Sequence, residues 1–244
     1  MPADTPILVA EGLHKRFGAL VVLDGVGLSI AQGEALGIVG PNGAGKTTLL
    51  SVLAGAQAPN AGRIHFRGDD VTTLAAPARS RRGLARTHQI PRPFSGMTVF
   101  ENVYVAASQA GGATGAEAYD VATDALALCG MLKVANRPAE TLGLLDRKRL
   151  ELARALATRP TVLLLDEIGG GLTNAEADEL VAAIRELRGR GISIVWIEHI
   201  VHVLLQVAER LICMDAGKII ADGEPRAVLA DAEVVAAYLG GTPA

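Results

Sequence analysis

The sequence is poor in aromatic residues and in cysteine. Aromatic side chains make up 3% of the 244 residues, and the two cysteines are Cys129 and Cys213. So few rings leave little surface on which nucleic-acid bases can stack. Both cysteines lie in apolar stretches far apart in the sequence, so we expect two buried thiols in a reducing compartment. Two cysteines are also too few to build a metal cluster.

The chain has no excess of positive charge and no long hydrophobic run. Its formal net charge is -3, whereas binding to a phosphate backbone needs clustered positive charge, so we expect no nucleic-acid partner. The apolar run 192–205 contains Glu198, His199 and His202 and is too short to cross a bilayer. Residues 1–6 have neither the basic start nor the apolar core of a signal peptide. We therefore expect a soluble, cytoplasmic protein.

Half of the residues are hydrophobic, which is enough for a large core, and strand patterns alternate with helix patterns. This alternation predicts an α/β fold with a doubly wound, mostly parallel sheet, after an antiparallel β-subdomain at the N-terminal end. A ligand of such a fold lies at the carboxyl ends of the strands. Strands are expected at 7–17, 20–30, 35–39, 62–67, 84–90, 162–167, 192–198, 211–214 and 218–221, and helices at 48–55, 77–82, 98–107, 116–132, 147–157, 175–189 and 200–208.

A helical segment interrupts the strand pattern. Pro91 and Pro93 mark a break, and residues 98–158 contain helix patterns alone. We therefore expect a single domain, 1–244, whose nucleotide-binding core (1–90 and 159–244) carries an inserted helical subdomain (91–158). The short basic helix before the break, with Arg79, Arg81 and Arg82, is expected to be solvated.

The chain contains a complete phosphate-loop motif between the apolar strand 35–39 and a helix that begins at about Lys46. Its glycines let the backbone curl so that N–H groups face phosphate oxygens, and the helix N-terminus adds a positive dipole. Lys46 brings a full charge to the β- and γ-phosphates, and the Thr47 hydroxyl can hold Mg²⁺. The residues expected to bind nucleotide are Gly40, Pro41, Asn42, Gly43, Ala44, Gly45, Lys46, Thr47 and Thr48.

Two carboxylates end the apolar strand 162–167. Asp166 suits coordination of Mg²⁺, and Glu167 beside it suits a group that orients or deprotonates an attacking water. Phe17 ends another predicted strand, next to Lys15 and Arg16. Its ring either stacks on a purine or belongs to the core, and the sequence does not decide between these alternatives.

Together with Gln89 after one strand and His199 at the end of another, these elements resemble the ATP-binding subunit of an ATP-binding-cassette (ABC) transporter. The resemblance covers nearly the whole chain and implies a P-loop NTPase that hydrolyses ATP with Mg²⁺. It implies that Phe17 stacks on adenine and that His199 contacts the γ-phosphate. It further implies that Gln89 senses Mg²⁺ and the attacking water and links the site to membrane subunits, so the implied catalytic residues are Glu167, His199 and Gln89, and the metal residues Thr47, Gln89 and Asp166.

The chain departs from the family pattern in two loops. The signature loop, usually Leu-Ser-Gly-Gly-Gln, aligns with residues 142–146, where Gly143, Leu144 and Leu145 replace the serine and both glycines. In the family this loop contacts the nucleotide on the opposite subunit of a dimer, so these three residues are implied to act in trans without a hydroxyl donor. Asp146 is expected to cap the following helix. The second departure is at residues 168–173, which lack the family's proline and its usual Asp or Asn.

Residues 86–94, 97–103 and 234–240 resemble the ATPases of importers for branched-chain or hydrophobic amino acids, which commonly pair two different ATPase subunits. This implies a location on the inner face of the cell membrane. The implied partners are transmembrane permease subunits, a second like or unlike ATPase subunit and, indirectly, a periplasmic or extracellular substrate-binding protein. Two alternatives remain open: the ATPase of a lipid or lipopolysaccharide export system, and a soluble cassette ATPase such as one for iron–sulfur cluster assembly.

Overall fold

The protein is built on two sheets, and the larger sheet has a hydrophobic core on each face. The structure, a computed structural model, describes residues 6–239. Residues 1–5, which belong to the segment expected to lack signal-peptide features, and Gly240 of the motif at 234–240 lie outside the described residues. A four-stranded antiparallel sheet has the order β2-β1-β4-β5, and a six-stranded sheet has the order β10-β9-β3-β8-β7-β6. In the second sheet every neighbouring pair is parallel except β9 and β10. The predicted fold class is confirmed.

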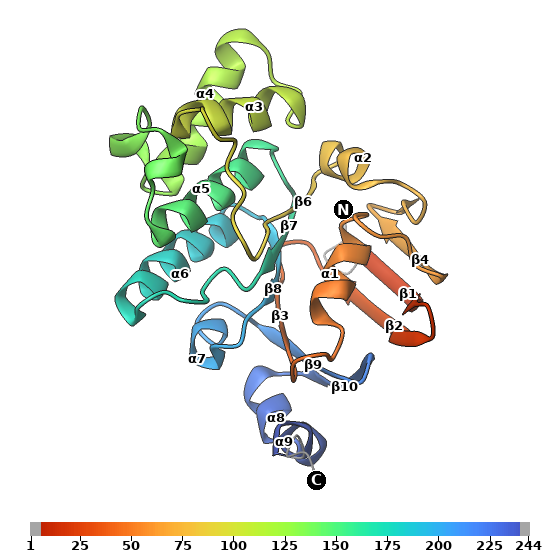
Figure 1. Ribbon diagram of the computed structural model, residues 1–244. Helices are drawn as coiled ribbons and strands as arrows, with labels where there is room; N and C mark the ends of the chain where they lie inside the picture. The colour runs from red at the N-terminus through yellow and green to blue at the C-terminus, as the bar shows by residue number, and fades with distance from the viewer. Residues whose placement is uncertain (1–5, 240–244) are drawn as a thin grey trace.

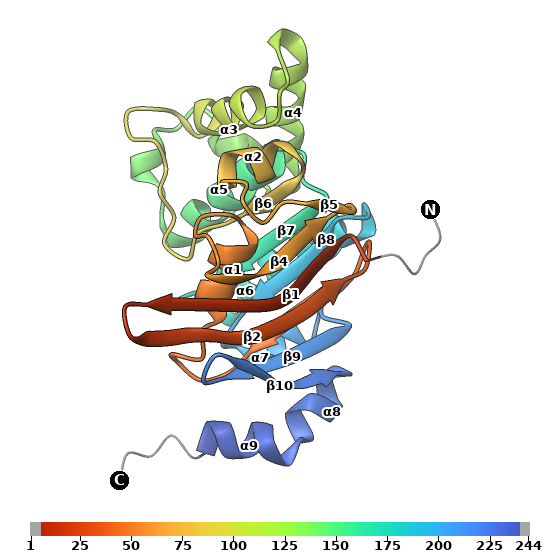
Figure 2. The same ribbon diagram turned by 90° about the vertical axis from the view of Figure 1, so that its right-hand side faces the viewer.

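The sheets are visible in Figures 1 and 2, where β1 and β2 lie toward the viewer in the second view. The strands are β1 (Leu8–Phe17), β2 (Leu20–Ile30), β3 (Ala35–Val39), β4 (Ala61–Phe66), β5 (Asp69–Asp70), β6 (Leu84–Arg86), β7 (Val162–Asp166), β8 (Ser193–Ile197), β9 (Arg210–Asp215) and β10 (Lys218–Gly223). The helices are α1 (Lys46–Leu53), α2 (Ala76–Arg81), α3 (Val99–Gln109), α4 (Gly115–Leu128), η1 (Leu132–Val134), η2 (Ala139–Thr141), α5 (Leu144–Ala157), α6 (Asn174–Gly189), α7 (Val201–Leu204), α8 (Pro225–Ala230) and α9 (Ala232–Leu239).

The parallel strands are buried on both faces, as their continuous apolar sequences require. In β7, Leu163 and Leu165 face the cluster that includes α5 and α6, whereas Val162 and Leu164 face the cluster that includes α1 and the antiparallel sheet. The sheet therefore separates two cores, and its strand ends meet at one edge. The two cysteines are buried and unpaired, as expected.

Helices α3, α4 and α5 pack on one another above the strand ends (Figure 1). They lie where the helical insertion was expected, and the boundaries 91 and 158 stay a prediction. Two helices at the other end, α8 and α9, were not predicted, and they lie below β9 and β10 in Figure 2. Among residues 6–239 there is no helix with the length and apolar character needed to cross a membrane.

The expectation that the basic helix α2 is wholly solvated is wrong for Arg79. This side chain is 1% exposed, and its guanidinium donates to the carbonyl oxygens of Val52 and Leu53 at 2.8 and 2.7 Å. It also donates to Leu74 and Thr72 at 2.9 Å each. Arg79 thus satisfies the last carbonyls of α1, the helix that begins in the phosphate loop.

Candidate nucleotide site

The phosphate loop fills the connection between β3 and α1 in the predicted order. Gly40 has φ 141°, and a Cβ at this position would lie 2.0 Å from the carbonyl oxygen of Met214. Gly45 has φ 100°, and a Cβ there would lie 2.5 Å from the Val22 oxygen. Only glycine fits at either position, because β9 and β2 approach the loop backbone so closely. The loop shape is therefore fixed by its neighbours.

A cleft of about 200 Å³ opens over this loop. Lys46 bends back across it, and its Nζ donates to the Gly40 and Pro41 carbonyl oxygens at 2.6 and 2.9 Å. Burial lowers the pKa of Lys46, and the charge of Glu167 opposes this shift. The residues that line the cleft are Val22, Asn42, Gly43, Ala44, Gly45, Lys46, Thr47, Thr48 and Glu167.

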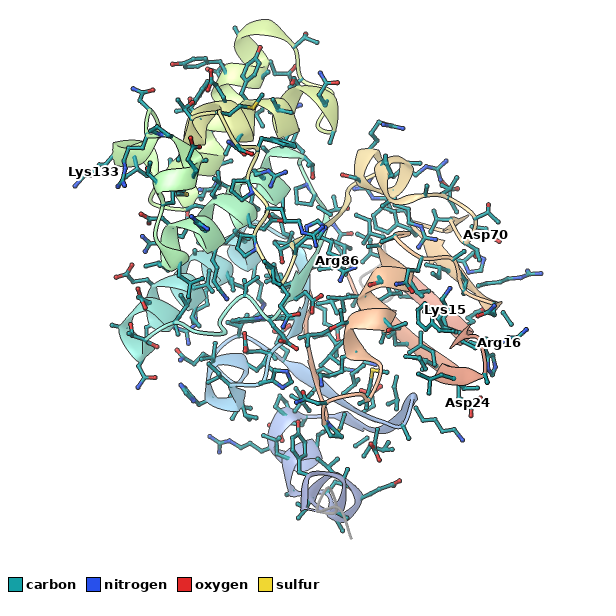
Figure 3. The ribbon with its side chains drawn as sticks, in the orientation of Figure 1. Lys15, Arg16, Asp24, Asp70, Arg86 and Lys133 are labelled. Atoms are coloured by element: carbon teal, nitrogen blue, oxygen red, sulfur yellow. The ribbon has the colours of Figure 1, made fainter. Side chains whose placement is uncertain are left out.

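Asp166 is buried at the carboxyl end of β7 and joins the phosphate loop to the neighbouring strand. One carboxylate oxygen, Oδ1, accepts a hydrogen bond from the Thr47 hydroxyl at 3.3 Å. The other, Oδ2, accepts from the Arg86 guanidinium at 2.7 Å. Figure 3 shows Arg86 at the centre of the molecule, and its charge compensates the buried carboxylate. The role of Arg86 was not predicted from the sequence.

Thr47 and Asp166 suit Mg²⁺, because a hydroxyl and a carboxylate oxygen converge beside the phosphate cleft. Within residues 6–239 no group of three or more His, Cys, Asp and Glu side chains forms a cage for a metal. Mg²⁺ usually binds one or two protein oxygens together with substrate phosphates and water, which is the number of oxygens that Thr47 and Asp166 offer. The amide of Gln89, the third residue expected to bind the metal, donates a hydrogen bond to Glu167.

Glu167 is held between the other two residues that were expected to be catalytic, His199 and Gln89. Its Oε1 lies 2.7 Å from Nε2 of His199, and its Oε2 accepts a hydrogen bond from the Gln89 amide at 2.5 Å. The three residues follow β8, β7 and β6, which are neighbours in the sheet, so parallel topology brings them together. Glu167 has φ 48°, an uncommon conformation for a residue with a side chain, and such conformations concentrate at functional sites.

Phe17 and the signature segment lie away from this cleft. Phe17 is 48% exposed at the end of β1, with the Lys15 ammonium 5.1 Å from its ring centre, so it is not a core residue. Leu144 is 49% exposed. Neither Phe17 nor Gly143, Leu144 or Leu145 lines the cleft of this chain. Their predicted contacts with nucleotide therefore stay predictions.

The expectation that Asp146 caps the signature helix is wrong. Helix α5 begins at Leu144 rather than Arg147, and its N-cap is Gly143, which makes no side-chain bond. Asp146 lies in the first helical turn, 3.8 Å from Arg149. The helix starts earlier because Gly143 already has the extended backbone of an N-cap, with φ -69° and ψ 175°.

A groove separates the helical segment from α2 and β6. We call it the interlobe groove; its two connected parts have volumes of about 510 and 270 Å³ and share Ser80, Arg86, His88, Gln109 and Ala110. At one end Phe94 is 42% exposed and packs under the Arg154 guanidinium at 4.5 Å. Glu151 on α5 contacts His88 at 2.8 Å and Arg154 at 3.1 Å.

Known proteins resemble the chain over nearly its whole length. It is 34% identical to the high-affinity branched-chain amino acid transport ATP-binding protein BraF of Pseudomonas aeruginosa and 36% identical to LivG of Escherichia coli, with 96% of this chain and 98% of either relative covered. The lipopolysaccharide export system ATP-binding protein LptB of Haemophilus influenzae is 33% identical, with coverage of 96% and 97%.

The fold and the domain families agree with these relatives. A nucleotide-free ATP-binding cassette from an ABC transporter superposes with a TM-score of 0.88 at 30% identity, covering 96% of this chain and 99% of that one. Residues 218–244 match a family described as branched-chain amino acid ATP-binding cassette transporter, and residues 23–169 match the ABC transporter family. The chain therefore belongs to the ABC transporter family, as one of its ATPases coupled to transport.

Proposed function

We propose that this chain hydrolyses Mg²⁺-ATP to drive an importer of branched-chain or other hydrophobic amino acids. The observation that carries the catalytic part is Glu167, which lies on the phosphate cleft with its carboxylate fixed by Gln89 and His199. In this position Glu167 orients a water and accepts its proton as the water attacks the γ-phosphate. Lys46 neutralises phosphate charge, and His199 contacts the γ-phosphate.

Thr47 and Asp166 would hold Mg²⁺, which supplies positive charge to the phosphate oxygens when it is bound. Arg86 holds the Asp166 carboxylate so that its other oxygen faces Thr47, because the guanidinium donates to Oδ2 at 2.7 Å. Phe17 stacks on the adenine from its exposed place at the end of β1. The contacts of Thr47, Asp166 and Arg86 support the first two assignments, and the exposure of Phe17 and the family resemblance support the third.

The transport part of the proposal rests on the interlobe groove and on the C-terminal family match. The lining of the groove combines apolar side chains with charged ones such as Arg86, Glu151 and Arg154, which suits an amphipathic cytoplasmic helix of a permease subunit. The chain would then lie on the inner face of the cell membrane beside a second ATPase subunit, with a periplasmic or extracellular substrate-binding protein acting through the permease. The transport names of the relatives weigh against a soluble iron–sulfur assembly ATPase.

The catalytic test is Glu167→Gln in the complex that co-purifies with the tagged chain. We expect ATP binding to remain and turnover to fall about a hundredfold or more, because the amide cannot take the proton. Unchanged turnover contradicts the role. Mass spectrometry of the same complex tests the transport class: permeases with a substrate-binding protein for apolar amino acids support the proposal. Components of lipopolysaccharide export, the activity for which LptB is named, would replace it.

A further inference from the structure

Glu198 is a buried carboxylate to which neither the motif nor the proposed mechanism assigns a role. It follows β8 and is 1% exposed. Its Oε2 accepts the backbone N–H of Gly169 at 2.8 Å, and its Oε1 accepts the backbone N–H of His199 at 3.0 Å. The Glu198 carboxylate thus joins its own loop to the loop after β7, across the 29 residues that separate it from Gly169.

The two bridged loops carry the residues that face each other in the site. Gly169 lies two positions after Glu167, and His199 is the partner of Glu167 at 2.7 Å. The Glu198 carboxylate therefore sets the distance between the backbones of Gly169 and His199. The side chains of Glu167 and His199 meet at the cleft. Because a charged acceptor makes stronger hydrogen bonds than a neutral one, a carboxylate fixes both N–H groups firmly.

Gly169 leaves the space that this carboxylate needs. A Cβ at position 169 would lie 2.6 Å from Oε2 of Glu198, so any larger residue would push the carboxylate off the Gly169 N–H. Among the three consecutive glycines at 169–171, the one at position 169 is therefore explained by the Glu198 carboxylate.

Lys148 approaches the same loop from the signature helix. The residue is 4% exposed on α5, and its Nζ donates to the Glu167 carbonyl oxygen at 3.4 Å, which also accepts the Gly170 N–H at 3.3 Å. Burial lowers the pKa of Lys148, and the charges of Glu198 and Glu167 offset part of this shift. The cation therefore lies in the field of both carboxylates.

We propose that Glu198 and Lys148 are positioning residues that hold the backbone of the Glu167 loop and tie it to the signature helix. Glu198 fixes this loop relative to His199, and Lys148 fixes it relative to α5, which begins in the segment expected to face the partner's nucleotide. A movement of α5 would in this way reach Glu167 through one side chain. This inference rests on the proposed roles of Glu167 and His199.

The expected signature is a loss of turnover without a loss of nucleotide binding. A displacement of a catalytic group by about 1 Å costs up to a hundredfold in rate, whereas neither residue lines the phosphate cleft. We expect Glu198→Gln to lower kcat by about 10- to 100-fold and to leave KM and the ATP dissociation constant within about threefold, because its amide cannot accept both N–H groups. Lys148→Met should lower kcat about tenfold, and Lys148→Arg should restore most of it.

The measurements use the co-purified complex, with thermal unfolding recorded for each variant. Glu34→Gln is the matched control: Glu34 is a largely buried carboxylate that accepts the Ala31 N–H at 2.7 Å and pairs with Arg210 at 3.1 Å, and it lies outside the cleft. It should leave kcat unchanged. If Glu198→Gln does not fold, the comparison of kcat between Lys148→Met and Lys148→Arg still tests the positioning role. Wild-type kcat in Lys148→Met, or a parallel loss of ATP affinity, would overturn the inference.

A combination with Glu167→Gln separates this inference from the proposed function. If Glu167 is the group being positioned, Glu198→Gln should lower the residual rate of Glu167→Gln by less than twofold, because effects on one unit are not additive. A full further loss in the double variant contradicts the positioning role alone. Normal turnover in Glu167→Gln by itself contradicts the proposed function instead.

Discussion

The backbone N–H of Gly40 donates a hydrogen bond of 2.7 Å to the hydroxyl oxygen of Tyr238, 198 residues later in the chain. Gly40 is the first residue of the phosphate loop. Tyr238 lies near the end of α9, in the segment 218–244 that matches the branched-chain amino acid ATP-binding cassette transporter family. The Tyr238 side chain is 47% exposed, and the partial desolvation of its hydroxyl raises its pKa. The last helix is thereby fastened to the nucleotide site.

We expect Tyr238→Phe to lower the thermal midpoint by about 2–4 °C and to weaken ATP binding about two- to fivefold. One hydrogen bond contributes about 1 kcal/mol, and its loss leaves the Gly40 N–H without this acceptor. Calorimetry and nucleotide titration measure the two effects. Tyr119→Phe, at an exposed tyrosine of α4, is the control. An unchanged midpoint and affinity in Tyr238→Phe would show that α9 does not support the loop.

Lys46→Ala should weaken ATP binding at least tenfold, because it removes the cation nearest the phosphates. Equilibrium titration with a fluorescent ATP analogue measures this. Lys133→Ala is the matched control, since Lys133 projects from the left edge of the molecule in Figure 3 and does not line the cleft. The contrast with Glu167→Gln is diagnostic: that variant should bind ATP normally. Equal affinities for Lys46→Ala and wild type would contradict the role of the loop lysine.

Phe94→Ala and Arg154→Met should uncouple ATP hydrolysis from transport while ATP affinity stays within about twofold. Both side chains end the interlobe groove and pack on each other at 4.5 Å, away from the phosphate cleft. Transport into vesicles and ATPase activity are measured on the same complex. The competing interpretation is that these residues only close the boundary between the lobes. A lower thermal midpoint with normal coupling would favour it.

The sequence predicted the residues whose positions depend on local motifs and on parallel topology. Glu167 and His199 meet because neighbouring parallel strands end at one edge, and the family resemblance supplied both His199 and Gln89. Contacts made by tertiary packing could not be predicted. Arg86 reaches Asp166 across 80 residues, and Tyr238 reaches Gly40 across 198. Neither pair has a spacing that a sequence pattern could have marked.

Local charge patterns were the least reliable guide. A run of arginines is usually solvated, yet the burial of Arg79 follows from four carbonyl groups that only the packed helices bring together. The mistaken cap at Asp146 has a similar origin. A glycine can serve as N-cap without a side chain, so the first acidic residue of a helix need not mark its beginning.

The last prediction concerns the signature segment, where Gly143, Leu144 and Leu145 replace a serine and two glycines. We expect the isolated chain to bind ATP well but to hydrolyse it slowly and dimerise poorly, because each site would be covered by a defective loop from an identical partner. The loss of one good donor to a developing phosphate charge costs about 3 kcal/mol, or about a hundredfold in rate. The exposed Leu144 offers an apolar surface in its place.

A partner ATPase with an intact signature loop should therefore restore hydrolysis at this chain's phosphate loop, while the partner's own nucleotide, facing Leu144 and Leu145, stays slow. Single-turnover measurements with Glu167→Gln in this chain, or the matching change in the partner, assign the rate to one site. The opposing hypothesis is that the N-terminus of α5 binds the phosphate with backbone N–H groups alone. Because α5 begins at Leu144, those groups are present, and rapid hydrolysis by the purified chain, rising with the square of its concentration, would favour that hypothesis and remove the need for an unlike partner.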